Sequence, residues 1–270
     1  MTTEGLGVAS AFTTAEGAEQ AAGEERRIQE AEYGFPYHYL PTFEKGKFSQ
    51  FRNLRWGYEY LSYTRFVLSK LAERDFDSLL DVGCGDGRLL YEARRLFPRK
   101  TLVGVDYFEP AVALARLLSP GVTYVRGDIT DPALLGRRFD AATLVDVLEH
   151  VPPAFLPEFV AGVRQHVEPG GRLVVTVPST NQPLNRKHYQ HFTLESLART
   201  LEPHFRVTEH HFINRRSRRV RLIESLLTNR LFILNERRLL RALYEDYERH
   251  ALRAGERDCK RICVVCAPAG

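Results

Sequence analysis

A glycine-rich turn between an apolar strand and a helix constrains the fold of this 270-residue chain most strongly. The segment reads Leu79-Leu80-Asp81-Val82-Gly83-Cys84-Gly85-Asp86-Gly87, so three alternating glycines directly follow the apolar run. Glycine lets the backbone turn tightly and approach a ligand without a Cβ in the way. A helix that starts behind the turn offers unpaired backbone N–H groups to the negative end of a ligand. The segment therefore predicts a ligand-binding turn.

The spacing of the glycines separates two classes of ligand. The nicotinamide fingerprint is Gly-x-Gly-x-x-Gly, whereas here the third glycine, Gly87, comes one residue early. Asp81 also lies in the turn region, where its carboxylate would repel a pyrophosphate. A carboxylate at this point suits a ligand with an ammonium group, such as the methionine part of S-adenosylmethionine.

Segments of strand and helix character alternate along the chain. Strands are expected at 78–82, 101–105, 122–126, 141–145, 172–177, 205–211 and 259–267, and helices at 57–73, 88–96, 111–118, 157–167, 194–201 and 218–252. This alternation predicts an α/β fold, a Rossmann-like, doubly wound sheet of seven strands with helices on both faces. We expect the sheet to be mostly parallel with an antiparallel last strand, and its ligand to bind beyond the C-terminal strand ends.

Composition divides the chain into five parts. Residues 1–30 contain few large apolar groups, so they are expected to form a disordered tail. The other parts are an aromatic and helical N-terminal cap at 31–75, the core at 76–216, a helical insert at 217–256 and the last core strand at 257–270.

Four aspartates lie at the C-terminal ends of four successive predicted strands, namely Asp81, Asp106, Asp128 and Asp146. Asp106, nineteen residues past Gly87, stands where a carboxylate usually accepts both ribose hydroxyls. Asp128 is placed to accept from an adenine amino group, and the Ile129 amide could donate to the ring. One such aspartate could merely cap a helix, but four predict a nucleoside site. The predicted cofactor-binding residues are Asp81, Gly83, Cys84, Gly85, Gly87, Asp106, Tyr107, Asp128, Ile129 and Asp146.

The motifs resemble those of the class I S-adenosylmethionine-dependent methyltransferases, in particular the small-molecule enzymes similar to the ubiquinone O-methyltransferases. LLDVGCGDG, GVDYFEPAVALAR and GDIT match the family's first three motifs, and LVDVLEHVP and EPGGRLVVTVP match the fourth and fifth. The resemblance covers about residues 76–212. It implies S-adenosylmethionine as cofactor and methyl transfer to a small-molecule acceptor, for which we favour a hydroxyl group. Methylation of RNA or a lipid-linked substrate, and a cofactor-binding pseudo-enzyme, are the alternatives.

Two histidines are the candidate general bases for transfer to a hydroxyl. His150 closes the motif Asp146-x-x-Glu149-His150, and His191 stands in a loop before a predicted helix. Each could instead only hold its loop. A divalent metal site of Asp146, Glu149, His150 and His191 is a less favoured alternative, because relatives with this pattern carry glutamate where Asp146 stands.

The acceptor pocket is expected in the segments added to the common core of such folds, namely the aromatic lead-in and the helical insert. The candidate substrate contacts are Tyr37, His38, Trp56 and His188, although the aromatic residues could simply pack the N-terminal cap onto the sheet. The apolar face of 218–252 could cover a pocket or form a homodimer contact.

Charge and hydropathy bound the partners. Residues 214–261 hold fourteen Arg or Lys against seven Asp or Glu, but the net charge is only +4, so a small molecule is favoured over nucleic acid. No apolar run approaches the ~18 residues that a membrane span needs. With no secretory leader in view, a cytoplasmic location is expected.

Overall fold

The computed structural model describes residues 42–44, 47–49, 54–227, 231–232, 234 and 236–269. The tail predicted at 1–30 and the candidate substrate residues Tyr37 and His38 lie outside the described residues. Trp56 falls within the helix α2 (Leu54–Ala72). A short antiparallel pair, β1 (Thr42–Glu44) and β2 (Lys47–Ser49), precedes this helix and was not predicted.

The main sheet has seven strands in the order β5-β4-β3-β6-β7-β9-β8. They are β3 (Ser78–Val82), β4 (Thr101–Asp106), β5 (Thr123–Arg126), β6 (Phe139–Val145), β7 (Val167–Pro178), β8 (Phe205–Arg215) and β9 (Cys259–Pro268). The strands from β5 to β7 pair in parallel, and β9 runs antiparallel to both β7 and β8. The predicted seven-stranded, mostly parallel sheet with an antiparallel last strand is confirmed.

The chain order reverses beside β3, because the chain first adds β4 and β5 on one side and then returns to place β6 on the other. Loops that leave β3 and its neighbours diverge at such a point and leave a crevice for a ligand. The fold therefore places a binding site at the C-terminal end of β3.

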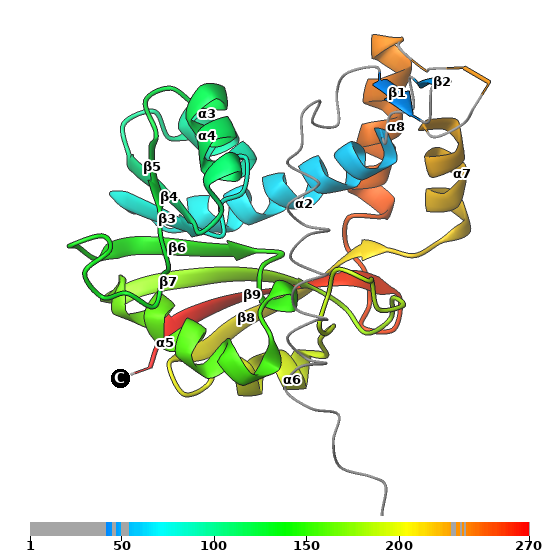
Figure 1. Cartoon of the computed structure of the whole chain (residues 1–270). Helices are drawn as coiled ribbons and strands as arrows, with labels where there is room; N and C mark the ends of the chain where they lie inside the picture. The colour runs from blue at the N-terminus through cyan, green and yellow to red at the C-terminus, as the bar shows by residue number, and fades with distance from the viewer. Residues whose placement is uncertain are drawn as a thin grey trace, which may run out of the picture.

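Helices cover both faces of the sheet (Figure 1). On one face, α2, α3 (Arg88–Leu96) and α4 (Glu109–Leu118) bury Leu68, Leu90 and Val112 in one apolar cluster with the strands. On the other face, α5 (Leu156–Gln165) and α6 (Leu194–Leu201) bury Val160 and Leu197 in a second cluster. The apolar spacing within these helices fixes which side of each one meets the sheet.

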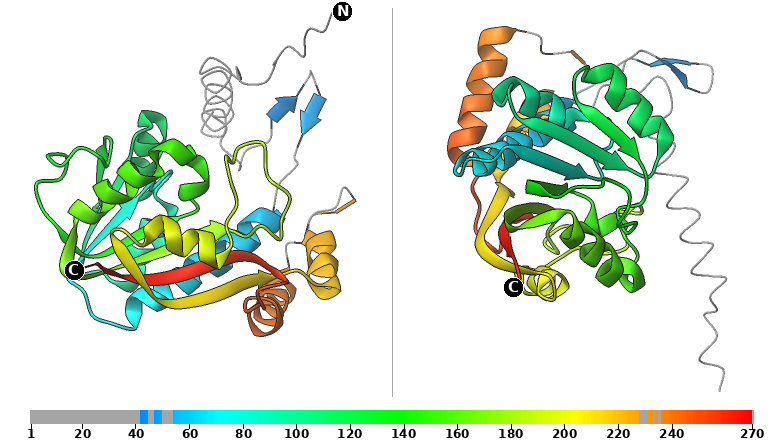
Figure 2. Two further views of the ribbon diagram at one scale, coloured as in Figure 1. Left: turned by 90° about the horizontal axis from the view of Figure 1, so that it is seen from below. Right: turned by 90° about the vertical axis from the view of Figure 1, so that its left-hand side faces the viewer.

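The insert before the last strand consists of two helices, α7 (Arg218–Leu227) and α8 (Arg237–His250), so the prediction of one helical stretch at 218–252 is wrong. The carboxylate of Glu236 accepts from the backbone N–H groups of Arg238 and Leu239, which starts α8 as a separate helix. Both helices lie near the N-terminal half of α2 (Figure 2). The homodimer contact expected here stays a prediction.

Several element boundaries differ from their predictions, most of all the start of β7. The helix expected to reach residue 167 ends at Gln165, and β7 already begins at Val167. The segment Pro169-Gly170-Gly171 lies inside β7, where the register against β6 shifts between Phe139 and Ala141. This irregularity accommodates a proline and two glycines that a regular strand disfavours. Within the described residues, no helix is both long and apolar enough to cross a membrane.

Candidate active site

The glycine-rich loop joins β3 to α3 at the point where the strand order reverses. Gly83, Gly85 and Gly87 have φ values of +69°, +53° and +76°, a region that residues with a Cβ rarely adopt. The N–H groups of Gly83 and Cys84 donate to the Val105 carbonyl at 2.8 and 3.0 Å, which ties the loop to β4. Gly87 is the N-cap of α3, so the first turn of that helix opens toward the loop.

Asp106 ends β4 beside this loop and is 9% exposed. Its Oδ2 accepts from the Gly85 N–H and its Oδ1 from the Phe108 N–H, both at 2.9 Å. Burial raises the pKa of Asp106, and these two donors oppose that shift. Each carboxylate oxygen has a second lone pair, so Asp106 can still accept two hydroxyl donors.

Asp81 lies in β3, just before the loop, and is 3% exposed. Thr143 donates to its Oδ1 at 2.7 Å. Burial raises the pKa of Asp81 to about 7; the Thr143 hydrogen bond opposes the shift, and the charge of Asp106 adds to it. A cationic ligand group beside Asp81 would restore the ionised carboxylate. Thr143 is therefore a site residue that sequence reasoning missed.

The other predicted cofactor residues follow β4 and β5, which are neighbours in the sheet. Tyr107 is exposed after β4, and Ile129 is buried after β5. Asp128 is exposed, and its Oδ1 accepts from the Thr130 N–H at 2.9 Å. The three residues thus lie along the same edge of the sheet as Asp106, and Tyr107 and Asp128 are the exposed ones.

The turn after β6 contacts the glycine loop directly. A Cβ on Gly83 would lie 2.7 Å from Cγ2 of Val147, so that glycine leaves room for the valine. The next residues form the 3-10 turn η1 (Leu148–His150), which carries Glu149 and His150. The contact between Gly83 and Val147 therefore holds the start of the turn that carries this Glu-His pair against the loop.

Two further histidines reach the same place from the loop before α6. The potential ligand atoms of Glu149, His150 and His188 all lie within 4.8 Å of one another. The His150 and His188 rings meet edge to face with centroids 4.8 Å apart. His191 stands behind His188, with its Nε2 2.8 Å from His188 Nδ1.

Hydrogen bonds assign the protons on these rings. His150 Nδ1 lies 3.0 Å from the Lys187 carbonyl, and His191 Nδ1 lies 3.2 Å from the Gln182 carbonyl. A carbonyl only accepts, so both Nδ1 atoms carry a proton. His191 Nε2 must then accept from His188 Nδ1. This leaves the Nε2 lone pairs of His150 and His188 to accept a proton. Both ring nitrogens of His191, a predicted base, already take part in hydrogen bonds.

Burial keeps this cluster uncharged. It lowers the pKa values of His150 and His191, and it lowers the pKa of His188 to about 3. Glu149 is 1% exposed, and burial raises the pKa of its carboxyl group. Its Oε2 has no hydrogen-bond partner among the described residues. A buried oxygen of this kind is costly unless a proton or cation satisfies it.

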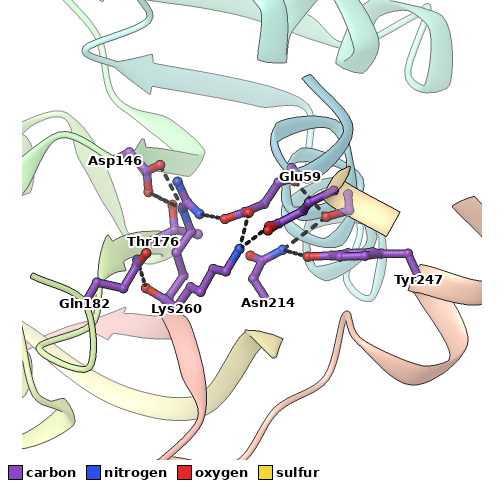
Figure 3. Close-up of polar contacts among 10 residues, drawn as sticks. Glu59, Asp146, Thr176, Gln182, Asn214, Tyr247 and Lys260 are labelled. Carbon is purple, nitrogen blue, oxygen red and sulfur yellow. Dashed lines mark hydrogen bonds and ion pairs between the residues drawn. The ribbon is translucent and has the colours of Figure 1, made fainter. Parts of the chain in front are cut away.

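The carboxylate of Asp146 does not join this cluster. Its Oδ1 accepts from Thr176 Oγ1 at 3.1 Å (Figure 3), and its Oδ2 accepts from Arg261 Nε at 3.0 Å. The metal set proposed from the sequence therefore changes: Asp146 is paired with Arg261, and His188 takes the place beside Glu149. Arg261 lies 115 positions further along the chain, and no local pattern signals this pairing.

Comparison with known proteins places these features in a family. A family model described as a methyltransferase domain matches residues 51–220. The chain is 27% identical over 162 residues to trans-aconitate 2-methyltransferase of Deinococcus radiodurans, covering 60% of this chain and 57% of that protein. It is 37% identical over 120 residues to nocamycin O-methyltransferase of Saccharothrix syringae, covering 42% of each. The chain thus spans about half the length of these two relatives.

Solved structures share the fold. Magnesium protoporphyrin IX methyltransferase of Synechocystis, with bound S-adenosylhomocysteine, has a TM-score of 0.55 at 13% identity, covering 91% of this chain and 100% of that one. The N-methyltransferase NodS of Bradyrhizobium japonicum, in complex with S-adenosylhomocysteine, has a TM-score of 0.53 at 13% identity, covering 79% and 88%. Because the family model covers more than half of the chain, the protein belongs to the class I methyltransferases, whose cofactor is S-adenosylmethionine.

Proposed function

We propose that this protein transfers the methyl group of S-adenosylmethionine to a hydroxyl group of a small-molecule acceptor. The observation that carries the proposal is the position of two neutral imidazoles, His150 and His188, in a cluster that adjoins the glycine loop. A neutral imidazole with an open lone pair is suited to accept a hydroxyl proton. One relative, nocamycin O-methyltransferase, is named for transfer to oxygen.

The residues of the loop would hold the cofactor at one end. Asp106 would accept the ribose hydroxyls, Asp81 would face the ammonium group, and the glycines would allow close backbone approach. When bound, the cofactor supplies a methyl group on a sulfonium, which is an activated leaving group. Most of the remaining work is alignment of the acceptor oxygen with the methyl carbon.

His150 is the proposed base for the acceptor. A C–O bond forms as the C–S bond breaks, and the hydroxyl proton goes to the open Nε2 of His150. The Lys187 carbonyl holds the opposite nitrogen, Nδ1, and so keeps the ring in the required tautomer. His191 would act one step further away, by fixing the tautomer of His188.

His150→Ala is expected to lower kcat by about 100-fold, the usual contribution of a general base, while cofactor affinity changes little. The measurement is release of S-adenosylhomocysteine with phenols, sugars and quinols as acceptors. His204→Ala is the control, because His204 directly precedes β8, which starts at the end of the sheet opposite the glycine loop. Tight cofactor binding without turnover of any acceptor would contradict the proposed function. A steep salt dependence of acceptor binding would favour RNA instead.

Cofactor binding is expected to release a proton near neutral pH. The pKa of Asp81 is about 7 in the free protein, and an ammonium group beside it would lower that pKa. Because the ligand prefers the ionised carboxylate, affinity should rise with pH by up to about tenfold per unit below pH 7. Calorimetry between pH 5 and 7, in two buffers of different ionisation enthalpy, measures the effect. Asp81→Asn should abolish it, and pH-independent affinity in the unaltered protein would refute the assignment.

Metal-assisted transfer by the same cluster is a second candidate, favoured by Oε2 of Glu149, which has no hydrogen-bond partner in the described part of the chain. One carboxylate and two imidazoles form a donor set that suits a divalent transition metal, so Glu149, His150 and His188 fit such an ion. It would supply a Lewis acid for the acceptor oxygen. We expect methyl transfer to survive dialysis against EDTA. Loss of activity on dialysis, together with saturable Mn²⁺ binding that Glu149→Gln removes, would establish the metal-assisted function instead.

A further inference from the structure

A buried array of charged side chains joins the helices α2 and α7 to the end of β6. Figure 3 labels Glu59, Lys260 and Asp146 of this array. Glu59 of α2 lies between two residues of β9, with Oε2 2.7 Å from Lys260 Nζ and Oε1 2.6 Å from Arg261 Nη1. Lys260 Nζ also lies 2.8 Å from Oε1 of Glu224 in α7. Arg261 continues the array to Asp146 at the end of β6.

Burying such an array costs desolvation free energy. Each of its five side chains, Glu59, Asp146, Glu224, Lys260 and Arg261, is less than one-fifth exposed. Removing ions from water is costly, and apolar side chains of similar size often replace buried ion pairs without loss of stability. The array therefore calls for a role besides stabilising the fold.

Asp146 is the member of the array whose backbone is unusual. Its φ is +54°, in the left-handed region that a residue with a Cβ rarely adopts. Its N–H donates to the Thr176 carbonyl at 3.0 Å. Its carboxylate accepts from the Thr176 hydroxyl, the Arg261 guanidinium and the Tyr63 hydroxyl, and Arg261 is the cation among these donors. The conformation at Asp146 sets the direction in which the chain leaves β6.

The residues that follow Asp146 form the turn that carries the proposed base. Val147 comes first and packs against Gly83, and η1 then presents Glu149 and His150. A change of φ at Asp146 would swing this whole turn relative to the glycine loop. An interaction that fixes Asp146 therefore fixes the distance between the cofactor loop and the proposed base.

We propose that Arg261 is a positioning residue for methyl transfer: it holds Asp146 in the left-handed conformation and so aims the 147–150 turn at the cofactor loop. Glu59 orients Arg261 from α2, and Lys260 of β9 connects Glu59 to Glu224 of α7. The Arg261 guanidinium also stacks on the Tyr63 ring, 4.1 Å from the ring centroid, which limits its movement. The effect on transfer rests on the proposed function, whereas the effect on the turn does not.

Lys70 provides a matched control. It is 8% exposed, and its Nζ lies 2.8 Å from Glu73 and 2.7 Å from Glu209. It thus joins α2 to β8 through Glu209. Like Arg261, it contacts two carboxylates, but these contacts do not involve Asp146. Loss of either cation should destabilise the fold, and only loss of Arg261 should disturb the turn.

The test compares Arg261→Met with Lys70→Met in the full chain. Arg261→Met should lower kcat by about 100-fold, as a displacement near 1 Å can, with cofactor affinity changed by less than about threefold. Amide hydrogen exchange of residues 146–151, measured by mass spectrometry, should speed up in Arg261→Met and stay unchanged in Lys70→Met. Equal effects of the two variants on exchange or on kcat would overturn the proposal.

A second substitution tests the mechanism. Glycine adopts the left-handed conformation without strain, and it removes the carboxylate that Arg261→Met leaves buried without a cationic partner. Asp146→Gly in the Arg261→Met background should therefore recover at least about tenfold in kcat, a gain that a purely stabilising role of Arg261 does not predict. No recovery would overturn the proposal.

The test stays decisive if Arg261→Met does not fold and if no acceptor is methylated. If Arg261→Met does not fold, Arg261→Lys replaces it, because one ammonium cannot reproduce the fork that meets both Asp146 and Glu59; unchanged exchange of 146–151 in that variant would overturn the proposal. If the unaltered protein methylates no acceptor, the proposed function fails, but the exchange measurement needs no acceptor and still decides the role of Arg261.

Discussion

Asp106→Ala is expected to weaken the binding of S-adenosylhomocysteine by about 100-fold or more. The carboxylate would lose two charge-assisted hydrogen bonds to ribose hydroxyls, each contributing about 1.5–3 kcal/mol, and each 1.4 kcal/mol is a factor of about ten in affinity. The substitution also leaves the N–H groups of Gly85 and Phe108 without their acceptor. Calorimetric titration measures the loss. Asp106→Asn keeps one acceptor oxygen, so its affinity for S-adenosylhomocysteine should lie between those of the unaltered protein and Asp106→Ala.

Asp140→Ala is the matched control for this prediction. Asp140 lies near the opposite end of β3, where its Oδ2 accepts from the N–H and hydroxyl of Ser78 at 2.9 and 2.8 Å. Its loss should lower the free energy of unfolding but leave cofactor affinity within about twofold, since additive effects are expected of distant sites. Unchanged affinity in Asp106→Ala, or an equal loss in Asp140→Ala, would show that the ribose does not bind at Asp106.

Gly83→Ala should impair both stability and methyl transfer. The positive φ of +69° costs a residue with a Cβ about 1–2 kcal/mol. The new Cβ would also lie 2.7 Å from Val147 Cγ2, so the turn that carries Glu149 and His150 must move. A displacement of that kind should lower kcat by about tenfold or more. Thermal unfolding and steady-state kinetics measure the two effects separately.

Gly121→Ala is the control that separates the effect of backbone strain from the effect of moving the 147–150 turn. Gly121 has a φ of +91°, but a Cβ there meets nothing within 4 Å. This variant should lose a similar amount of stability and keep its kcat. Adding Val147→Ala to Gly83→Ala removes the clashing methyl groups and should restore part of the rate. If the double variant is no faster than Gly83→Ala, the contact between loop and turn does not set the rate.

The parallel core could be predicted because its signals are local. The predicted bounds of β3, α3 and α6 agree with the structure, since apolar runs of strand length, the glycine turn and a threonine cap mark them. The helix boundaries within the insert were harder to predict. Its apolar residues continue at near-helical spacing from α7 into α8, so the pattern did not show where one helix ends.

The cofactor end of the site was easier to predict than the acceptor end. Glycines and aspartates at strand ends identify the loop, Asp81 and Asp106, because the topology brings successive strand ends together. The role of Asp146 depends on Arg261, which a distant strand supplies. His188 was placed with the substrate contacts because sequence spacing cannot show that the loop before α6 folds back against η1.

The central claim is that the glycine loop and its neighbouring carboxylates form a site for S-adenosylmethionine. Calorimetric titration of the unaltered protein with S-adenosylhomocysteine, and in parallel with a nicotinamide dinucleotide, tests it most directly. We predict saturable heat with S-adenosylhomocysteine, lost in Asp106→Ala, and none with the dinucleotide. Binding of the dinucleotide with no heat from S-adenosylhomocysteine would contradict the account.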